Sequence, residues 1–214
     1  MDFTPIDLAK WPRRETFYYF SEMAPTGYSV TVNVDVTGLR EKLREKGLKF
    51  FPVYLWLVTK CLNEQVEFKV AYQNGVLGYY NTLTPLYAAF HEDDKTFSLM
   101  WTEFDEDLLM FHRNYCENSE KYGEKHGILS QPGTPPENAY TVSCLPWVSF
   151  THFSVQNFDR KPYFFPSVEA GKLFYSEGKE WLPLSITCHH ATTDGYHVSR
   201  FLSRLSEEMD KLRA

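Results

Sequence analysis

A histidine and an aspartate stand four residues apart near the end of the chain, at His190 and Asp194. The apolar run over residues 182–188 before them is typical of a short buried strand. The residues from 196 onward repeat apolar side chains at the spacing of an amphipathic helix. His190 is therefore expected on a connecting loop, where a rigid scaffold can hold a reactive side chain. Imidazole changes charge close to neutral pH, so a neutral ring at this place suits a general base.

Ordinary structural roles also explain these residues. Asp194 is well placed to cap the last helix, and adjacent histidines near a helix start can be plain loop residues. A metal site is the weaker explanation, because His189 and His190 would point to opposite sides if extended. Only His197 lies near as a third ligand, without a cysteine or a carboxylate pair, so we expect no metal here.

The composition excludes several classes of partner. Its 22 basic and 28 acidic side chains give the 214-residue chain a net charge of −6, so no global positive field attracts nucleic acid. The chain shows no leader pattern and no apolar stretch long enough for a membrane span, and its scattered cysteines are expected as free thiols. A cytoplasmic protein with no membrane partner follows. Aromatic residues make up 17% of the chain, which favours a lined ligand pocket or a subunit interface.

Hydrophobic periodicity predicts one α/β domain over residues 1–214, a two-layer sandwich with a mixed β-sheet. The strongest local signal is Asn74-Gly75, which predicts a hairpin between two short apolar runs. Strands are expected over residues 27–36, 68–72, 76–80, 86–91, 96–104, 140–144, 147–153, 167–175 and 182–188. Helices are expected over residues 37–46, 53–64, 105–122 and 196–214.

The pattern His-His-Ala-x-x-Asp-Gly-x-His over residues 189–197 resembles the signature of the chloramphenicol acetyltransferase family. Further blocks that resemble this family follow in the right order: Trp-Pro-Arg-Arg-Glu at 11–15, Lys-Phe-Phe-Pro at 49–52, Thr-Phe-Ser at 96–98, Pro-x-Glu-Asn at 135–138 and Ser-x-Leu-Pro-Trp-Val-Ser-Phe at 143–150. The likeness runs from about Trp11 to the last helix. It implies a fold of the CoA-dependent acyltransferase type and a homotrimer with active sites between subunits.

The resemblance also implies a reaction. Acetyl-CoA is the co-substrate, and its acetyl group passes directly to a hydroxyl of an acceptor, chloramphenicol in this family, which inactivates the antibiotic. His190 is then the base, Ser143 donates to the oxyanion, and Asp194 pairs with Arg13 to hold the loop, whereas no catalytic role passes to His189. The roles fit the chemistry, because an alcohol attacks well only as its proton leaves and attack on a thioester builds negative charge on oxygen.

Five further positions match ligand-binding positions of the family. Lys49 and Lys172 match lysines near the 3′-phosphate of CoA, although a surface lysine is more often only a solvated charge. Three aromatic residues match positions that line the acceptor pocket, and core packing is their ordinary alternative. These three are Tyr19, Phe20 and Tyr28.

Two positions depart from the family pattern. Glu169 stands where a threonine commonly organises water near the transition state, and Ala24 leaves more room in the pocket. These departures keep two alternatives open, namely transfer to another alcohol and a non-catalytic small-molecule-binding trimer on the same scaffold. The acyltransferase core of a 2-oxo-acid dehydrogenase complex has a related motif, but residues 1–10 leave no space for a lipoyl domain or a linker.

Overall fold

The computed structural model describes residues 2–156 and 163–214, and its central element is a seven-stranded sheet. β7 (Ala139–Leu145) is parallel to its two neighbours, β5 (Thr84–Phe90) and β8 (Ser167–Gly171). The other pairs are antiparallel, so the predicted mixed sheet is confirmed. The remaining strands are β2 (Gly27–Asp35), β6 (Phe97–Trp101), β9 (Phe174–Ser176) and β10 (Lys179–His189), and the order is β2, β10, β8, β7, β5, β6, with β9 beside β10.

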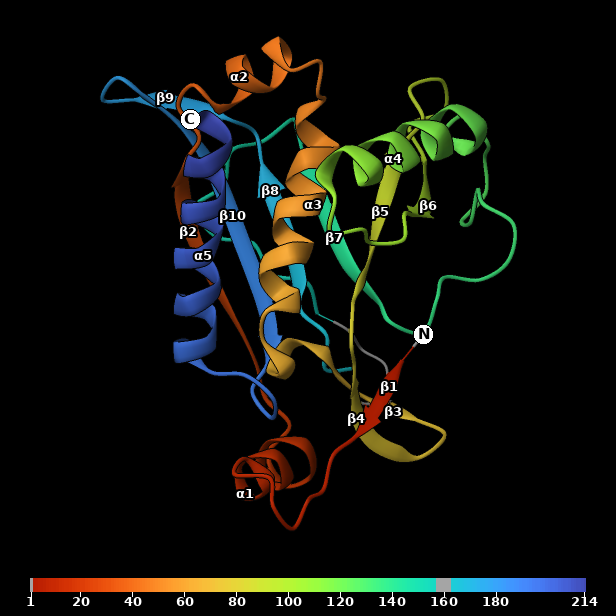
Figure 1. Ribbon diagram of the computed structural model, residues 1–214, viewed down its shortest axis with the longest axis vertical. Helices are drawn as coiled ribbons and strands as arrows, with labels where there is room; N and C mark the ends of the chain where they lie inside the picture. Colours follow the sequence, from red (N-terminus) through yellow and green to blue (C-terminus); the bar gives the residue numbers. More distant parts are fainter. Residues whose placement is uncertain (1, 157–162) are drawn as a thin grey trace.

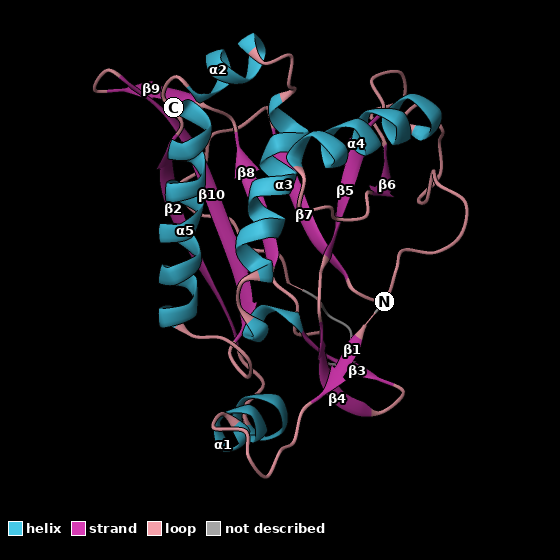
Figure 2. Cartoon of the chain, viewed as in Figure 1, coloured by secondary structure: helices cyan, strands magenta, loops and turns pink. Residues whose placement is uncertain are grey.

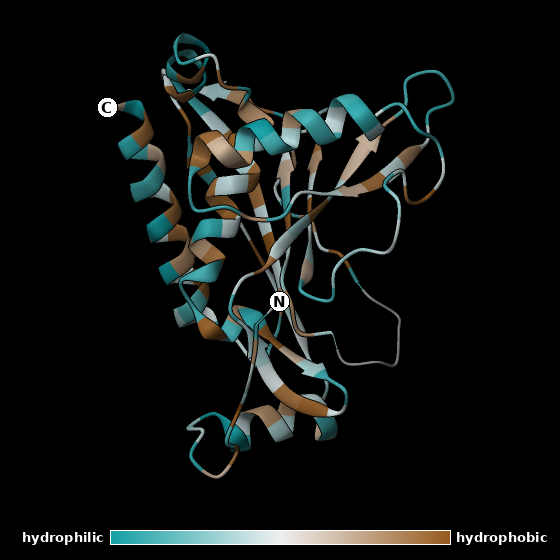
Figure 3. Ribbon diagram, turned by 45° about the vertical axis from the view of Figure 1, so that its right-hand side comes forward, coloured by the Kyte–Doolittle hydropathy of each residue, from teal (hydrophilic) through white to brown (hydrophobic). Residues whose placement is uncertain are grey.

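Helices cover one face of this sheet (Figure 1, Figure 2). α3 (Phe50–Asn63) lies between α4 (Leu108–Tyr122) and α5 (Gly195–Arg213), while α2 (Leu39–Glu45) lies at one end. α3 is apolar on nearly all sides because the sheet and two helices surround it. Hydrophilic and hydrophobic residues alternate along α5 in Figure 3, as expected for a helix with one buried side. The predicted two-layer α/β arrangement is therefore confirmed.

The opposite face of the sheet, which we call the open face, is polar near its centre. Strand alternation sends the valines of β2 and their neighbours toward the helices and the intervening residues to the open face. One row across the strands consists of Thr31, Ser185, Glu169 and Ser143. The next row, two residues along, consists of Ser29, Thr187, Ser167 and Thr141.

A smaller three-stranded sheet lies at the lower end of the molecule in Figure 1, near α1 (Arg14–Tyr18). The predicted Asn74-Gly75 hairpin is confirmed, and both residues have positive φ, 51° and 79°. The strands are β1 (Phe3–Pro5), β3 (Val70–Gln73) and β4 (Val76–Tyr80), with a 3₁₀ turn, η2 (Val66–Lys69), before β3. The first two residues of the predicted strand 68–72 therefore belong to this turn.

The predicted strand over residues 147–153 is wrong, because this segment is a turn and a loop that cross the open face. The Val148 carbonyl oxygen accepts from the Lys172 N–H at 2.8 Å, and the Phe153 carbonyl oxygen accepts from the Ser185 hydroxyl. Phe150 packs so closely on Gly171 that a Cβ there would stand 2.9 Å from its ring. The segment therefore packs on the sheet through Phe150 and does not extend the sheet as a strand.

Several predicted elements have different ends. The strand 96–104 shortens to β6, and 167–175 divides into β8 and β9. The helix predicted from 37 begins at Leu39, after Gly38 with φ of 75°. The helix predicted from 105 begins at Leu108, because the Asp107 side chain accepts from the first free backbone N–H groups.

None of the helices in the described residues is long and apolar enough to cross a membrane. All four cysteines are free thiols, as predicted.

Candidate active site

His190 follows the last residue of β10, and its ring has one nitrogen fixed by the loop. The backbone N–H of His190 donates to the Thr26 carbonyl oxygen at 2.8 Å, which continues the pairing with β2 by one residue. Its Nδ1 lies 3.0 Å from the Thr193 carbonyl oxygen. A carbonyl oxygen only accepts, so Nδ1 carries the hydrogen and the neutral ring has its lone pair on Nε2. Nε2 is the atom that can act as a base.

Aromatic rings on two sides hold His190. Phe20 stacks on the imidazole with centroids 4.1 Å apart, and Tyr28 meets it edge-on at 5.3 Å. The Tyr28 hydroxyl donates to the Thr193 side chain at 3.2 Å, and burial raises the pKa of this phenol far above its usual value, so it stays neutral. Tyr19 contacts Phe20 at 5.0 Å but is half exposed and lies one ring away from His190.

A π-helical turn, η1 (Tyr19–Met23), presents Phe20 to the imidazole. The turn closes with a hydrogen bond from the Ala24 N–H to the Tyr19 carbonyl oxygen at 2.8 Å. Such wide turns are rare in helices and are frequent at functional sites. No sequence signal marked this turn.

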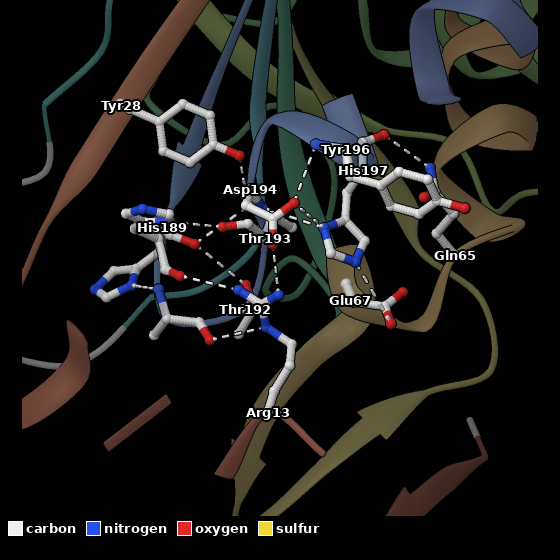
Figure 4. Close-up of polar contacts among 12 residues, drawn as sticks. Arg13, Tyr28, Gln65, Glu67, His189, Thr192, Thr193, Asp194, Tyr196 and His197 are labelled. Atoms are coloured by element: carbon white, nitrogen blue, oxygen red, sulfur yellow. Dashed lines mark hydrogen bonds and ion pairs between the residues drawn. The ribbon is translucent and has the colours of Figure 1, made fainter. Parts of the chain in front are cut away.

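Arg13 holds the loop at three points (Figure 4). Its Nη1 lies 2.7 Å from Asp194 Oδ2, so the pair predicted from the resemblance is confirmed. Its Nη2 donates to the His190 carbonyl oxygen at 3.2 Å, and its Nε donates to that of Ala191 at 3.4 Å. These two backbone contacts had no sequence signal. The guanidinium therefore orients the peptide that carries the imidazole.

The second oxygen of Asp194 caps α5. Oδ1 accepts from the Tyr196 N–H at 3.0 Å and lies 3.0 Å from His197 Nδ1. The cap and the ion pair are therefore both present. Burial opposes ionisation of Asp194, but Arg13 and His197 outweigh it and lower its pKa. His197 completes the cap, because its side chain accepts from the Asp194 backbone N–H. Sequence reasoning missed this capping role, although the place of His197 three residues after the capping aspartate was a usable signal.

His189 is fixed in the opposite tautomer. Its Nδ1 accepts from the Ala191 N–H at 3.2 Å, so the neutral ring carries its hydrogen on Nε2. Burial, followed by the nearby His190, lowers the pKa of His189. Its ring meets Phe164 edge-on at 5.0 Å. In the described part of the chain, side chains with metal-binding geometry gather elsewhere, at an exposed group near the other edge of the sheet (Asp93, Asp94 and His126).

Ser143 and His190 are far apart within one chain. Ser143 lies on β7, in the same row as Ser185 of β10 and two strands away from it. His190 lies five residues beyond Ser185, so a rise of about 3.3 Å per residue and a spacing of about 4.8 Å per strand separate the two residues by more than about 15 Å. One chain alone therefore cannot bring both side chains to the same acetyl group.

The two candidate lysines lie toward the Ser143 end of the sheet. Lys172 directly follows β8, which runs antiparallel to β10, so it lies at the opposite end of the strands from His190. Lys49 directly precedes α3, which begins at the same upper end in Figure 1. Both side chains are exposed, and the Lys49 N–H donates to His112 Nε2 at 2.9 Å.

A groove of about 1270 Å³ lies on the open face and contains His189 but not His190. Its floor includes Ser29, Thr187, Ser167 and Thr141, the second polar row described above. The volume suits a drug-sized molecule or a long, narrow one. Glu169 and Ser143 lie one row deeper, beside the loop that follows β7.

Comparisons with known proteins agree with these features. Residues 1–206 match the family described as chloramphenicol acetyltransferase. A chloramphenicol acetyltransferase of Campylobacter coli is 39% identical over 99% of this chain and 100% of its own length. One from Clostridium perfringens is 37% identical over 97% of this chain and 94% of its own length.

Solved structures support the fold. A chloramphenicol acetyltransferase superposes with a TM-score of 0.86 at 24% identity, and the match covers 96% of this chain and 99% of that one. A dihydrolipoamide acetyltransferase of Azotobacter vinelandii superposes with a TM-score of 0.65 at 18% identity, over 100% and 98% of the two chains. The predicted fold type is thus confirmed. By its sequence over nearly the whole length, the chain belongs to the chloramphenicol acetyltransferase family.

Proposed function

We propose that this chain, acting as one domain, transfers the acetyl group of acetyl-CoA to a hydroxyl of chloramphenicol. The observation that carries the proposal is the hydrogen bond from His190 Nδ1 to the Thr193 carbonyl, which leaves Nε2 free as a base. Family membership supports the substrates, because the relatives are named for this reaction. Since acetyl-CoA is available inside the cell, we assign the reaction to the cytoplasm.

In the proposed mechanism, His190 Nε2 removes the proton of the acceptor hydroxyl as its oxygen attacks the thioester carbonyl. The C–O bond forms, and the carbonyl electrons move to oxygen, where the Ser143 hydroxyl donates to the negative charge. When the carbonyl re-forms, the C–S bond breaks and CoA leaves as a thiolate, which takes the proton from the imidazolium. No acyl-enzyme forms and no metal takes part.

The separation of His190 from Ser143 supports a homotrimer with its active sites between subunits. In such a site, one subunit supplies His190, and its neighbour supplies Ser143 together with Lys49 and Lys172 for CoA. Exposed aromatic side chains near the β5–β6 edge offer an apolar contact surface. Phe97 is 51% exposed and Trp147 is 61% exposed, and the Trp147 ring contacts Phe90 at 4.7 Å.

Release of free thiol from acetyl-CoA, measured with and without chloramphenicol, tests the reaction. We expect acceptor-dependent release that falls about 10²- to 10⁴-fold in His190→Ala. His189→Asn is the matched control and should keep most of the turnover, because no proton transfer is assigned to it. Equal activity of His190→Ala and wild type would contradict the proposal, as would tight binding of chloramphenicol without release.

Mixing two inactive variants tests the shared site. His190→Ala subunits and Ser143→Ala subunits should regain activity when they are unfolded together and refolded, because some interfaces then combine an intact His190 with an intact Ser143. Each variant treated alone is the control. If trimers that contain both variants, identified by their mass, show no recovered activity, then each site lies within one chain.

Transfer to another alcohol is a second candidate, favoured by Glu169 at a position where the family commonly has threonine. A screen of alcohol-bearing antibiotics alongside chloramphenicol separates the two. The acceptor with the highest kcat/KM identifies the substrate class.

A further inference from the structure

Glu169 lies at the centre of the open face and is nearly fully buried. It is on β8 and is 1% exposed. Ser185 of β10 lies beside it on one side, and Ser143 of β7 lies beside it on the other, both on the same face of the sheet. The loop after β7 covers this row, since its Phe153 carbonyl accepts from Ser185. Glu169 is therefore the direct neighbour of the proposed oxyanion donor.

The carboxyl group of Glu169 is only half satisfied. Oε1 accepts a short hydrogen bond from the Ser167 hydroxyl. Oε2 is buried and has no hydrogen-bond partner within the described residues. The other two buried glutamates each have a cation, Arg40 at 2.9 Å from Glu180 and Lys60 at 2.7 Å from Glu208. Among the ion pairs of the described residues, Glu169 takes part in none.

The described groups around Glu169 do not supply a positive charge that would balance its carboxylate. β10 and β7 contribute Ser185 and Ser143, and α3 contributes Tyr54, whose phenol is buried. The charge of Glu169 adds to the burial that raises the pKa of both Tyr54 and Cys188, so these groups stay neutral. His152 and His189 line the groove beyond Ser167 and do not bind the carboxyl group. Burial raises the pKa of Glu169 itself to about 7.

Ser143 has one hydroxyl hydrogen, which can serve only one acceptor at a time. An ionised Glu169 only accepts, so it competes with the oxyanion for this hydrogen. Oε2 has no hydrogen-bond partner within the described residues, so in a neutral Glu169 it is the oxygen whose O–H can donate to Ser143 Oγ, which leaves the serine hydrogen free for the oxyanion. The two protonation states of Glu169 therefore have opposite effects on the same step.

We propose that Glu169 is a positioning residue that works as a neutral carboxylic acid, aligns the Ser143 hydroxyl toward the oxyanion, and stops acetyl transfer when it ionises. The inference rests on the proposed function, since it requires acetyl transfer with Ser143 as donor. This role of Glu169 is distinct from binding of the acceptor, because Glu169 acts on the reaction through the neighbouring Ser143 hydroxyl.

The pH dependence of thiol release tests this inference in the full-length protein. Wild-type kcat at saturating substrates should fall roughly tenfold per pH unit above about 7, with little change in KM. Glu169→Gln cannot ionise and should lose this fall, and Glu169→Thr should lose it too. Glu180→Gln is the matched control, since it removes a buried carboxyl far from Ser143, and it should keep the fall.

Ser143→Ala tests whether Glu169 acts through the Ser143 hydroxyl. Its turnover should be lower by about 10²- to 10³-fold, and the remaining activity should no longer fall above neutral pH. The inference is overturned if wild type shows no such fall, if Glu169→Gln retains it, if Ser143→Ala retains it, or if the effect lies in KM for the acceptor. Absence of acceptor-dependent release by wild type at every pH would instead overturn the proposed function.

Discussion

Two buried glutamates lie on opposite sides of the molecule and have opposite surroundings. Glu208 on α5 is 4% exposed and accepts from Lys60, Lys211 and Arg204. Burial opposes its ionisation, but the lysines outweigh that effect and hold its pKa at about 2. Glu169 on the open face is also buried, and within the described residues its carboxyl group accepts only from the Ser167 hydroxyl, so burial raises its pKa to about 7.

The difference separates a stabilising carboxylate from one that costs stability. In the helical layer, three cations surround Glu208, so its charge ties α3 to α5. On the open face, an uncompensated Glu169 lowers the stability of the folded state whenever it ionises. A cost of this kind is tolerated more readily at a functional site than elsewhere in a protein. This contrast points to a role for Glu169 in the reaction.

Glu208→Gln should produce the largest loss of stability, about 2 to 3 kcal/mol at pH 7, because it leaves the surrounding cations without their anion. The folded-state pKa of Glu208 is depressed from 4.5 to about 2, so its contribution is present above pH 4.5 and disappears as the pH falls through 2. Urea unfolding of both proteins at pH 7 and pH 3 measures the difference. An equal difference at both pH values would contradict the assigned cause.

Glu169→Gln should have the opposite sign and increase the free energy of unfolding by about 2 kcal/mol at pH 8. The folded-state pKa of Glu169 is raised from 4.5 to about 7, so the folded state retains a proton that the unfolded state has lost between these values. Wild-type stability therefore falls across this window, and the variant escapes the fall. The two proteins should be equally stable at pH 4. A variant less stable than wild type at pH 8 would remove the contrast with Glu208.

Asp194→Asn should cost about 1 kcal/mol, since the Arg13–Asp194 pair is partly buried, less than Glu208 and more than an exposed surface pair. Asparagine still caps a helix well, so the substitution removes the ion pair and keeps most of the cap. Turnover should also fall, because Arg13 orients the His190 carbonyl. Thermal unfolding and thiol release measure both effects. A variant that is equally heat-stable and fully active would show that the pair does not hold the loop.

Glu117→Gln should have the smallest effect, a shift in Tm of less than about 1 °C. Its partner Arg113 lies 3.7 Å away on the solvent side of α4, where water screens the pair. Thermal unfolding at low and high salt checks this expectation. A clear loss of stability would show that exposure does not determine how much a carboxylate changes the free energy of unfolding, which the comparison of Glu208 with Glu169 assumes.

Local patterns predicted most elements of the fold. Asn74-Gly75 predicted its hairpin because few residue pairs accept two positive φ angles in succession. The alternation of β2 predicted a strand with one polar face, which became part of the open face. The strand predicted over residues 147–153 is a turn and a loop instead, because packing across a sheet and pairing within it select similar side chains.

For the candidate site, the resemblance led to the Arg13–Asp194 pair, which the structure contains. The second role of Asp194 as a helix cap was visible from its position alone. The hydrogen bonds from Arg13 to the His190 and Ala191 carbonyls could not be predicted, because they join segments nearly the whole chain apart.

Residue type and spacing identified a base candidate at His190, and the family resemblance implied a serine donor at Ser143. Only the arrangement of the strands determined that His190 and Ser143 lie at opposite ends of one sheet and that Glu169 is buried with no cation paired to it among the described residues. Burial and charge compensation depend on residues far away in the sequence, and no local pattern encodes which of them will meet.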